Sequence, residues 1–215
     1  MNYFDKKPND TETNFVKSNQ RVLKSMFGRD DLLPLWIADM DFEVAPCITK
    51  ALQEIIDRGV YSYEFEPNDL PEVMANWYKK RHQIELNSNH FVYAPSVLSA
   101  IALILQEFSD EQSGVVIQTP VYHMFETLIK KNNRKVVTNP LVLKEGKYVM
   151  DLGQLEQQII KEGVKLMILC NPHNPTGRVW TKNELKDLIT VLEKHEVLFL
   201  SDEIHADIVF KENQF

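Results

Sequence analysis

The sequence predicts an α/β fold built on a mainly parallel sheet with helices on both faces. Short apolar runs of the buried-strand type, such as Val115-Val116-Ile117 and Leu166-Met167-Ile168-Leu169, alternate with amphipathic stretches of helical period. Strands separated by helices of about 10–15 residues indicate βαβ units, whose strands lie parallel in one sheet. The 215 residues are enough to bury a core as one domain with an appendage.

The N-terminal part of the chain departs from this alternation. Up to about Asp41 it has scattered charge, no sustained period and glycine and proline breakers, so we expect an irregular arm. A helix is predicted over residues 46–58, where apolar residues recur at helical spacing before Gly59. Asp69 is expected to cap a second helix.

Each later element is bounded by a local signal. Helices are expected to begin at the capping residues Ser96, Asp151 and Thr181, and another near Tyr122. The predicted strands cover residues 91–94, 114–118, 135–137, 165–169 and 197–200. Neither G-x-G-x-x-G nor a P-loop occurs, so nucleotide binding by those routes is not expected.

Composition narrows the class of protein. The chain has 44% hydrophobic and 26% charged residues, close to a globular average, and we expect a soluble, cytoplasmic enzyme. The net charge of −7 and the lack of a basic cluster argue against nucleic acid as a partner. No apolar stretch reaches the roughly 18 residues that cross a bilayer, so no membrane partner is expected. The two cysteines, Cys47 and Cys170, lack metal-site spacing and are interpreted as buried free thiols.

Two polar side chains follow neighbouring predicted strands. Asn174 lies in the turn Cys-Asn-Pro-His-Asn-Pro-Thr-Gly of residues 170–177, and Asp202 ends the next apolar run. Either residue alone is usually a turn residue or a helix cap. Open α/β sheets bind ligands at the carboxyl ends of their strands. Together, an amide and a carboxylate at that edge can hold an aromatic heterocycle at a ring oxygen and a ring nitrogen.

The order and wording of these motifs resemble those of fold-type I pyridoxal-phosphate (PLP) enzymes, and in particular the MalY/PatB-type cystathionine β-lyases. The resemblance covers nearly the whole chain, at residues 35–42 (LWIADMDF), 60–63 (VYSY), 93–97 (YAPSV), 119–122 (TPVY), 174–180 (NPTGRVW) and 201–205 (SDEIH). It implies the large domain of that fold, truncated, in a protein that forms homodimers. It also implies PLP as cofactor and cleavage of the Cβ–S bond of cystathionine and other cysteine S-conjugates. The products would be a thiol, pyruvate and ammonia.

The resemblance assigns four residues to the cofactor ring. Asn174 corresponds to the family's ligand of the ring oxygen O3′, and Asp202 to the partner of the ring nitrogen. Tyr122 matches the aromatic residue that stacks on the ring, although a core tyrosine is an equal reading from the residue alone. His205 stands where many relatives carry a tyrosine directed at O3′, and it could also act through Asp202.

Other positions correspond to the family's phosphate contacts. Val97 and Leu98 match the turn whose backbone N–H groups bind the phosphate, which suits the start of a helix. Tyr63 matches a tyrosine that reaches the phosphate of the other subunit. Ser62 replaces the usual glycine before it, and Tyr61 is a competing candidate.

The substrate is expected to be a small amino acid. Ala38 and Asp39 match the backbone segment near its carboxylate, with a plain structural turn as the alternative. His173 is expected to be a solvated loop residue beside the site. No pair of histidines has metal-site spacing, so no metal is predicted.

The lysine that anchors the cofactor and removes the α-proton lies, in this family, in an S-x-S-K-x-F-N-type motif beyond the aspartate. No lysine of this sequence has that context, and Lys211 lies in a charged segment too close to Asp202. We therefore expect residues 1–45 to be an N-terminal arm with a small-domain segment, and residues 46–215 a partial large domain without catalytic residues of its own. Such a fragment should be inactive alone. An aminotransferase of the same fold, or a non-catalytic PLP-binding or interaction fragment, is the alternative, and the W-x-A-D-M-D-F element at residues 36–42 argues against the first.

Overall fold

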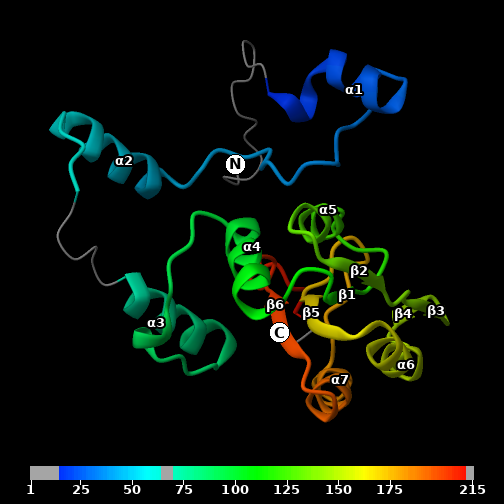
Figure 1. Cartoon of the computed structure of the whole chain (residues 1–215). Coiled ribbons are helices and arrows are strands. Elements are labelled where there is room, and N and C mark those ends of the chain that lie inside the picture. Colours follow the sequence, from blue (N-terminus) through cyan, green and yellow to red (C-terminus); the bar gives the residue numbers. More distant parts are fainter. Residues whose placement is uncertain (1–14, 64–69, 212–215) are drawn as a thin grey trace. The chain divides into compact units, whose positions relative to one another are not determined.

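The computed structural model of the chain describes residues 15–63 and 70–211, which fall into two compact units (Figure 1). The first unit comprises residues 1–67 and the second residues 68–215. The predicted helix cap Asp69 lies outside the described residues. Residues 46–63 therefore group with the N-terminal unit here, and the predicted domain boundary at residue 45 stays a prediction about the complete fold.

The first unit contains a helix that the sequence analysis did not predict. Its elements are η2 (Val16–Ser18), α1 (Gln20–Phe27) and α2 (Pro46–Arg58). The Asn19 side chain caps α1 by accepting the Arg21 N–H at 3.0 Å, and Gly28 ends it with φ +74°. The expectation of an irregular arm is therefore wrong for residues 20–27, because a cap and a left-handed glycine bound a pattern of only two turns. Helix α2 ends at Gly59 as predicted.

Helix α2 buries none of its residues within the first unit. Its apolar stripe is exposed at Ile48, Leu52, Ile55 and Ile56. Cys47 is exposed as well, so the expectation of two buried thiols holds for Cys170 alone. An apolar residue type predicts burial only where a packing partner covers it.

The second unit is built on a parallel four-stranded sheet. Its strand order is β2-β1-β5-β6, and every neighbouring pair is parallel. The strands are β1 (Gly114–Ile117), β2 (Lys135–Thr138), β5 (Val164–Cys170) and β6 (Leu198–Asp202). At the start of β1 a Cβ atom on Gly114 would lie 3.0 Å from the Glu162 carbonyl oxygen and 3.1 Å from the Val164 Cα of β5, so a side chain here would force this backbone to shift.

Helices connect and flank these strands. They are α3 (Leu70–His82), η3 (Ser88–His90), α4 (Val97–Phe108), α5 (Met124–Lys131), α6 (Leu152–Glu162) and α7 (Lys182–Lys194). The predicted caps are confirmed, because the Ser96, Asp151 and Thr181 side chains accept backbone N–H groups at the starts of α4, α6 and α7. Thr181 also forms a reciprocal capping box with Glu184.

Two local predictions are corrected. Residues 91–94 are not a strand: they have no strand partner among the described residues, and Val92 is 93% exposed. An antiparallel hairpin that the sequence analysis missed joins β3 (Val142–Lys144) to β4 (Lys147–Val149). Glu145 and Gly146 form its two-residue turn with φ +48° and +76°, a less obvious signal than Asn-Gly or Asp-Gly.

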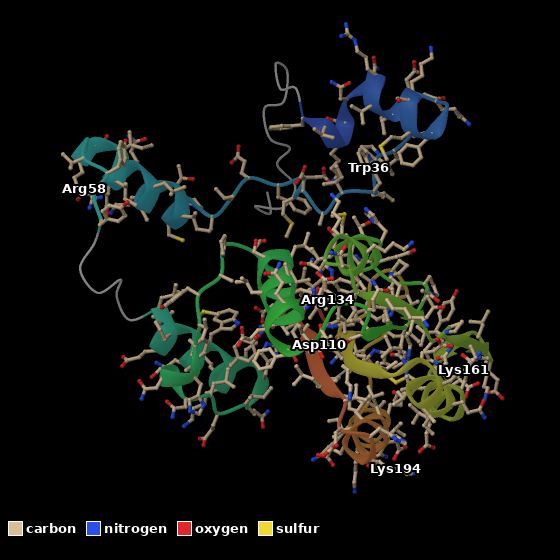
Figure 2. The ribbon with its side chains drawn as sticks, viewed as in Figure 1. Trp36, Arg58, Asp110, Arg134, Lys161 and Lys194 are labelled. Atoms are coloured by element: carbon tan, nitrogen blue, oxygen red, sulfur yellow. The ribbon has the colours of Figure 1, made fainter. Side chains whose placement is uncertain are left out.

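Alternate residues of the strands enter two separate cores. Val115, Ile117, Leu166 and Ile168 pack with α4 and α5, whereas Val116, Val137, Met167 and Leu169 pack with α6 and α7. Helices therefore cover both faces of the sheet, as predicted (Figure 1). On the second face Glu156 of α6 bonds to Lys194 (2.7 Å), labelled in Figure 2, and to His195 (2.8 Å) at the end of α7.

Candidate functional site

The carboxyl ends of β5 and β6 bring the two predicted motifs side by side. In the sheet register Cys170 lies opposite Asp202, and the Asn171 N–H donates to the Asp202 carbonyl oxygen at 3.0 Å. The turn that contains Asn174 therefore begins directly beside the strand end that carries Asp202. This is the edge at which open α/β sheets bind ligands.

The Asp202 carboxylate is held in one orientation. The side chain is part of the sheet edge at 6% exposure, and its Oδ1 accepts the Ile204 N–H at 3.1 Å. Among the described residues Oδ2 has no hydrogen-bond partner. A buried carboxylate with one free oxygen can accept a proton donor such as a protonated ring nitrogen. His205 is half-buried in the turn that follows, where its carbonyl accepts the Ile208 N–H at 2.9 Å.

The turn that carries Asn174 is fixed at its base. The His173 N–H donates to the Arg178 carbonyl at 2.7 Å, and the Gly177 N–H donates back to the His173 carbonyl at 2.8 Å. Gly177 has φ +70°, a conformation that glycine adopts without strain. The Asn174 N–H donates to Cys170 Sγ at 3.3 Å, while its half-buried carboxamide has no partner in the described part of the chain. The amide is thus oriented by backbone contacts and is available to a ligand.

The start of this turn is pinned to Trp180. The Asn171 carboxamide oxygen accepts the Trp180 backbone N–H at 3.1 Å, and the indole N–H donates to the Cys170 carbonyl at 3.2 Å. The Cys170 thiol lies in the same buried corner, and burial raises its pKa to about 11. Because a thiolate is the reactive form, this cysteine is structural rather than nucleophilic near neutral pH.

His173 is buried, and the expectation of a solvated loop residue is wrong. The residue is 2% exposed, its Nδ1 lies 3.0 Å from the Thr176 hydroxyl oxygen, and its ring meets the Trp180 ring edge-on. Burial lowers the pKa of His173. The sequence offered little sign of this, because a histidine between two prolines has no periodicity from which burial can be predicted.

The remaining cofactor candidates of this unit border the same edge. A short loop joins the end of helix α4 to the start of β1, so the helix and the strand run in opposite directions. The first residue of α4 therefore lies toward the carboxyl end of β1. Its first N–H groups, those of Val97 and Leu98, have no acceptor within the helix. Tyr122 follows β1, is half-buried, and packs edge-on against Phe125 with ring centroids 5.6 Å apart.

The other candidates belong to the first unit. Tyr63 is fully exposed there, and the competing Tyr61 is 72% exposed. The segment that contains Ala38 and Asp39 is held by Lys17, whose ammonium donates to the Asp39 carbonyl at 2.6 Å and to both carboxylate oxygens of Asp41 at 2.9 Å. The structure leaves the proposed roles of Tyr63, Ala38 and Asp39 as predictions.

Lys17 is a residue that the sequence analysis missed. It is buried although it is a lysine. Its backbone carbonyl accepts the indole N–H of Trp36, the tryptophan labelled in Figure 2, at 3.0 Å. It thus ties the W-x-A-D-M-D-F segment to a part of the chain about twenty residues away. The two aspartates of that segment are the one signal that a cationic partner was needed.

The described residues offer neither a metal site nor a membrane-spanning helix. Residues 15–63 and 70–211 contain no group of three or more histidine, cysteine, aspartate or glutamate side chains that could hold a metal ion. None of the helices in these ranges has both the length and the apolar character to cross a membrane.

Comparison with known proteins identifies the family. The fold is of the α/β class with a candidate ligand site at the strand ends, and residues 30–215 match the family "Aminotransferase class I and II". The chain belongs to this family. It is 37% identical over 206 residues to "Cystathionine beta-lyase PatB" of Bacillus subtilis, covering 96% of the chain and 53% of that protein. It is 40% identical over 187 residues to "Protein MalY" of Escherichia coli, covering 86% of the chain and 48% of that protein.

Solved structures agree with the fold. The crystal structure of cystalysin from Treponema denticola, which contains a pyridoxal 5′-phosphate cofactor, superposes with a TM-score of 0.88 at 30% identity. It covers the whole of this chain, and the chain covers 55% of it. The chain thus spans about half the length of the relatives that it matches. The predicted family and fold class are confirmed.

Proposed function

We propose that this chain forms the greater part of the cofactor domain of a PLP-dependent carbon–sulfur β-lyase. The complete protein would cleave cystathionine or a related cysteine S-conjugate, with uptake of one water, to a thiol, pyruvate and ammonia. The observation that carries the cofactor assignment is the pairing of a free Asn174 carboxamide with a buried Asp202 carboxylate at one sheet edge. The reaction class is supported by the names of the similar relatives.

The donor set of the edge fits a phosphorylated pyridine. Asp202 offers a carboxylate oxygen for a ring nitrogen, Asn174 an N–H for a ring oxygen, and the start of α4 offers free N–H groups and the positive end of a helix dipole for a phosphate. Pyridoxal phosphate, when bound, supplies a ring that withdraws the electron pair released at the substrate's α-carbon.

The residues of this chain would prepare that chemistry rather than perform the proton transfer. Asp202 would hold the proton on the ring nitrogen, Asn174 would orient the ring through O3′, and Tyr122 would cover one ring face and exclude water. His205 would support Asp202 or O3′. The backbone of Ala38 and Asp39 would receive the substrate carboxylate.

Proton transfer would need a lysine that residues 1–215 do not contain in the family's motif. We therefore propose that these residues alone bind PLP without a covalent bond and do not turn over substrate. Tyr63, exposed in the first unit, would contact the phosphate of a second subunit, so the complete protein would be a homodimer.

The test uses the chain and the complete product of its gene. The 215-residue chain is mixed with PLP, reduced with borohydride and analysed by mass spectrometry; a specifically labelled lysine would contradict the proposal for the chain. The complete product is given cystathionine, with and without a 2-oxo acid. Release of thiol and pyruvate independent of the oxo acid supports the lyase, whereas amino transfer to the oxo acid would establish an aminotransferase.

A further inference from the structure

The backbone of His173 closes the turn that carries Asn174. Its own N–H and carbonyl make both hydrogen bonds that close the turn, to Arg178 and Gly177. Asn174 follows directly in the chain, so any rotation of His173 is transmitted to the Asn174 carboxamide. The buried ring is fixed on one side by the Trp180 ring, with centroids 5.7 Å apart.

The hydrogen bonds of the turn allow a neutral imidazole whose Nδ1 accepts the Thr176 hydroxyl hydrogen. The Thr176 hydroxyl oxygen accepts the Arg178 N–H at 3.4 Å and lies 3.0 Å from His173 Nδ1. That oxygen accepts from Arg178 and can also use its own hydrogen to donate to Nδ1. A neutral imidazole that accepts at Nδ1 carries its hydrogen on Nε2. The lowered pKa of His173, caused by burial and opposed by the Gln118 backbone, agrees with a neutral ring.

The His173 ring lies close to the end of the neighbouring strand β1. Nε2 is buried and has no hydrogen-bond partner among the described residues, and the same holds for Oε1 of Gln118, the residue that follows β1. The Gln118 backbone lies near the His173 ring. From Gln118 the chain runs over four residues to Tyr122. His173 thus belongs to the turn that carries Asn174 and lies near Gln118, the residue from which the chain continues to Tyr122.

We propose that His173 is a positioning residue of the cofactor site, a neutral imidazole that sets the Asn174 turn through Thr176 and joins it to the Gln118 end of β1. This inference rests on the proposed function, because the carboxamide that it places is the one proposed to bond O3′ of the cofactor. Loss of the imidazole should therefore weaken binding of the ring oxygen specifically, and leave the phosphate contacts of α4 unchanged.

The test compares two ligands by equilibrium dialysis against the 215-residue chain: PLP, and 3-deoxypyridoxal 5′-phosphate, which lacks the ring hydroxyl. His173→Gln and Thr176→Val should each weaken PLP binding by about three- to tenfold, the range of one hydrogen bond, and change binding of the deoxy compound less than about twofold. Asn174→Ala should give the same pattern. The double variant H173Q/T176V should be no worse than either single variant.

His173→Asn is the matched rescue variant. Its carboxamide oxygen can occupy the place of Nδ1 and accept the Thr176 hydroxyl hydrogen, so preference for PLP over the deoxy compound should be retained. A purely structural role predicts the reverse: H173Q and H173N would weaken both ligands equally, and this result would overturn the proposal.

A measurement without ligand separates this inference from the proposed function. Ring nitrogen chemical shifts of His173 at pH 7 should report the Nε2–H tautomer, and Thr176→Val should move the Nδ1 signal. An Nδ1–H tautomer or a charged ring would overturn the positioning role. Equal affinity of the unaltered chain for PLP and the deoxy compound would refute the proposed contact of Asn174, and the positioning role would fall with it. An intact Nε2–H tautomer in that case would locate the failure in the proposed function.

Discussion

Replacing Trp180 by phenylalanine tests whether the buried indole stabilises the turn that carries Asn174. The indole is 2% exposed, donates from Nε1 to the Cys170 carbonyl at 3.2 Å, and lies under the Arg178 guanidinium at 4.8 Å from the ring centroid. Phenylalanine keeps most of the apolar contact but removes the indole donor to the buried carbonyl. That loss is worth about 1–3 kcal/mol.

Two smaller effects also lower the stability of the W180F variant. A weaker cation–π contact with Arg178 costs about 0.5–1 kcal/mol, and the smaller ring leaves a partial cavity worth about 1 kcal/mol. We expect W180F to lower the free energy of unfolding by about 3 kcal/mol, which for a chain of this size lowers the melting temperature by about 6–12 °C.

The assay is urea unfolding followed by circular dichroism at 222 nm, with melting temperature as a second reading. Trp77→Phe is the matched control, because Trp77 is 49% exposed and its indole N–H donates to the exposed Asp207 carboxylate. It should cost less than about 1 kcal/mol. If W180F is no more destabilising than W77F, the account of Trp180 as the support of the Asn174 turn is wrong.

Three further predictions concern groups outside that turn. In the native chain at pH 8, iodoacetamide should modify Cys47 first and Cys170 only on unfolding, because a pKa of about 11 leaves about one thiolate in a thousand; equal rates, followed by mass spectrometry, would contradict the burial of Cys170. Gly114→Ala should lower the free energy of unfolding by about 1–3 kcal/mol, since its Cβ would press on backbone. Gly153→Ala, in the first turn of α6, should be neutral or stabilising, because its Cβ makes an ordinary 3.6 Å contact with Asp151 Oδ1; equal effects in urea unfolding would refute the steric account. The pKa of Glu156 is lowered, chiefly by the hydrogen bond from Lys194 of α7. The ionised carboxylate therefore stabilises the fold at pH values above its ordinary pKa of 4.5, and this stabilisation is lost as the pH falls through the lowered pKa. Glu156→Gln should therefore be less stable than the unaltered chain at pH 7 and equally stable in acid; a difference that persists in acid would show that the effect is not electrostatic.

Local physics was enough to predict most of the second unit. The strands and helices alternate as the apolar pattern indicated, and Ser96, Asp151 and Thr181 cap the helices that they were expected to cap. These features depend on neighbours three or four residues away, which a sequence displays directly. The shared sheet edge of Asn174 and Asp202 also followed from sequence, because parallel strands end at the same side of a sheet.

Several features depended on contacts between distant residues. Buried Lys17 reaches the carbonyl of Asp39, and Trp77 bonds to Asp207 over 130 residues. No local pattern encodes such a partner. The unpaired segment 91–94 shows the converse, since its residues are suited to a strand but no strand of the described chain lies beside it.

Burial was the property that sequence alone predicted least well. Cys47, a residue type that is usually buried, is exposed on α2, while the polar His173 is buried beneath the Asn174 turn. The sequence by itself determined most of the helices and strands of the second unit and the edge at which the two motifs meet. Tertiary packing determined which side chains are removed from water, because burial is a property of the surfaces that cover a residue and not of the residue itself.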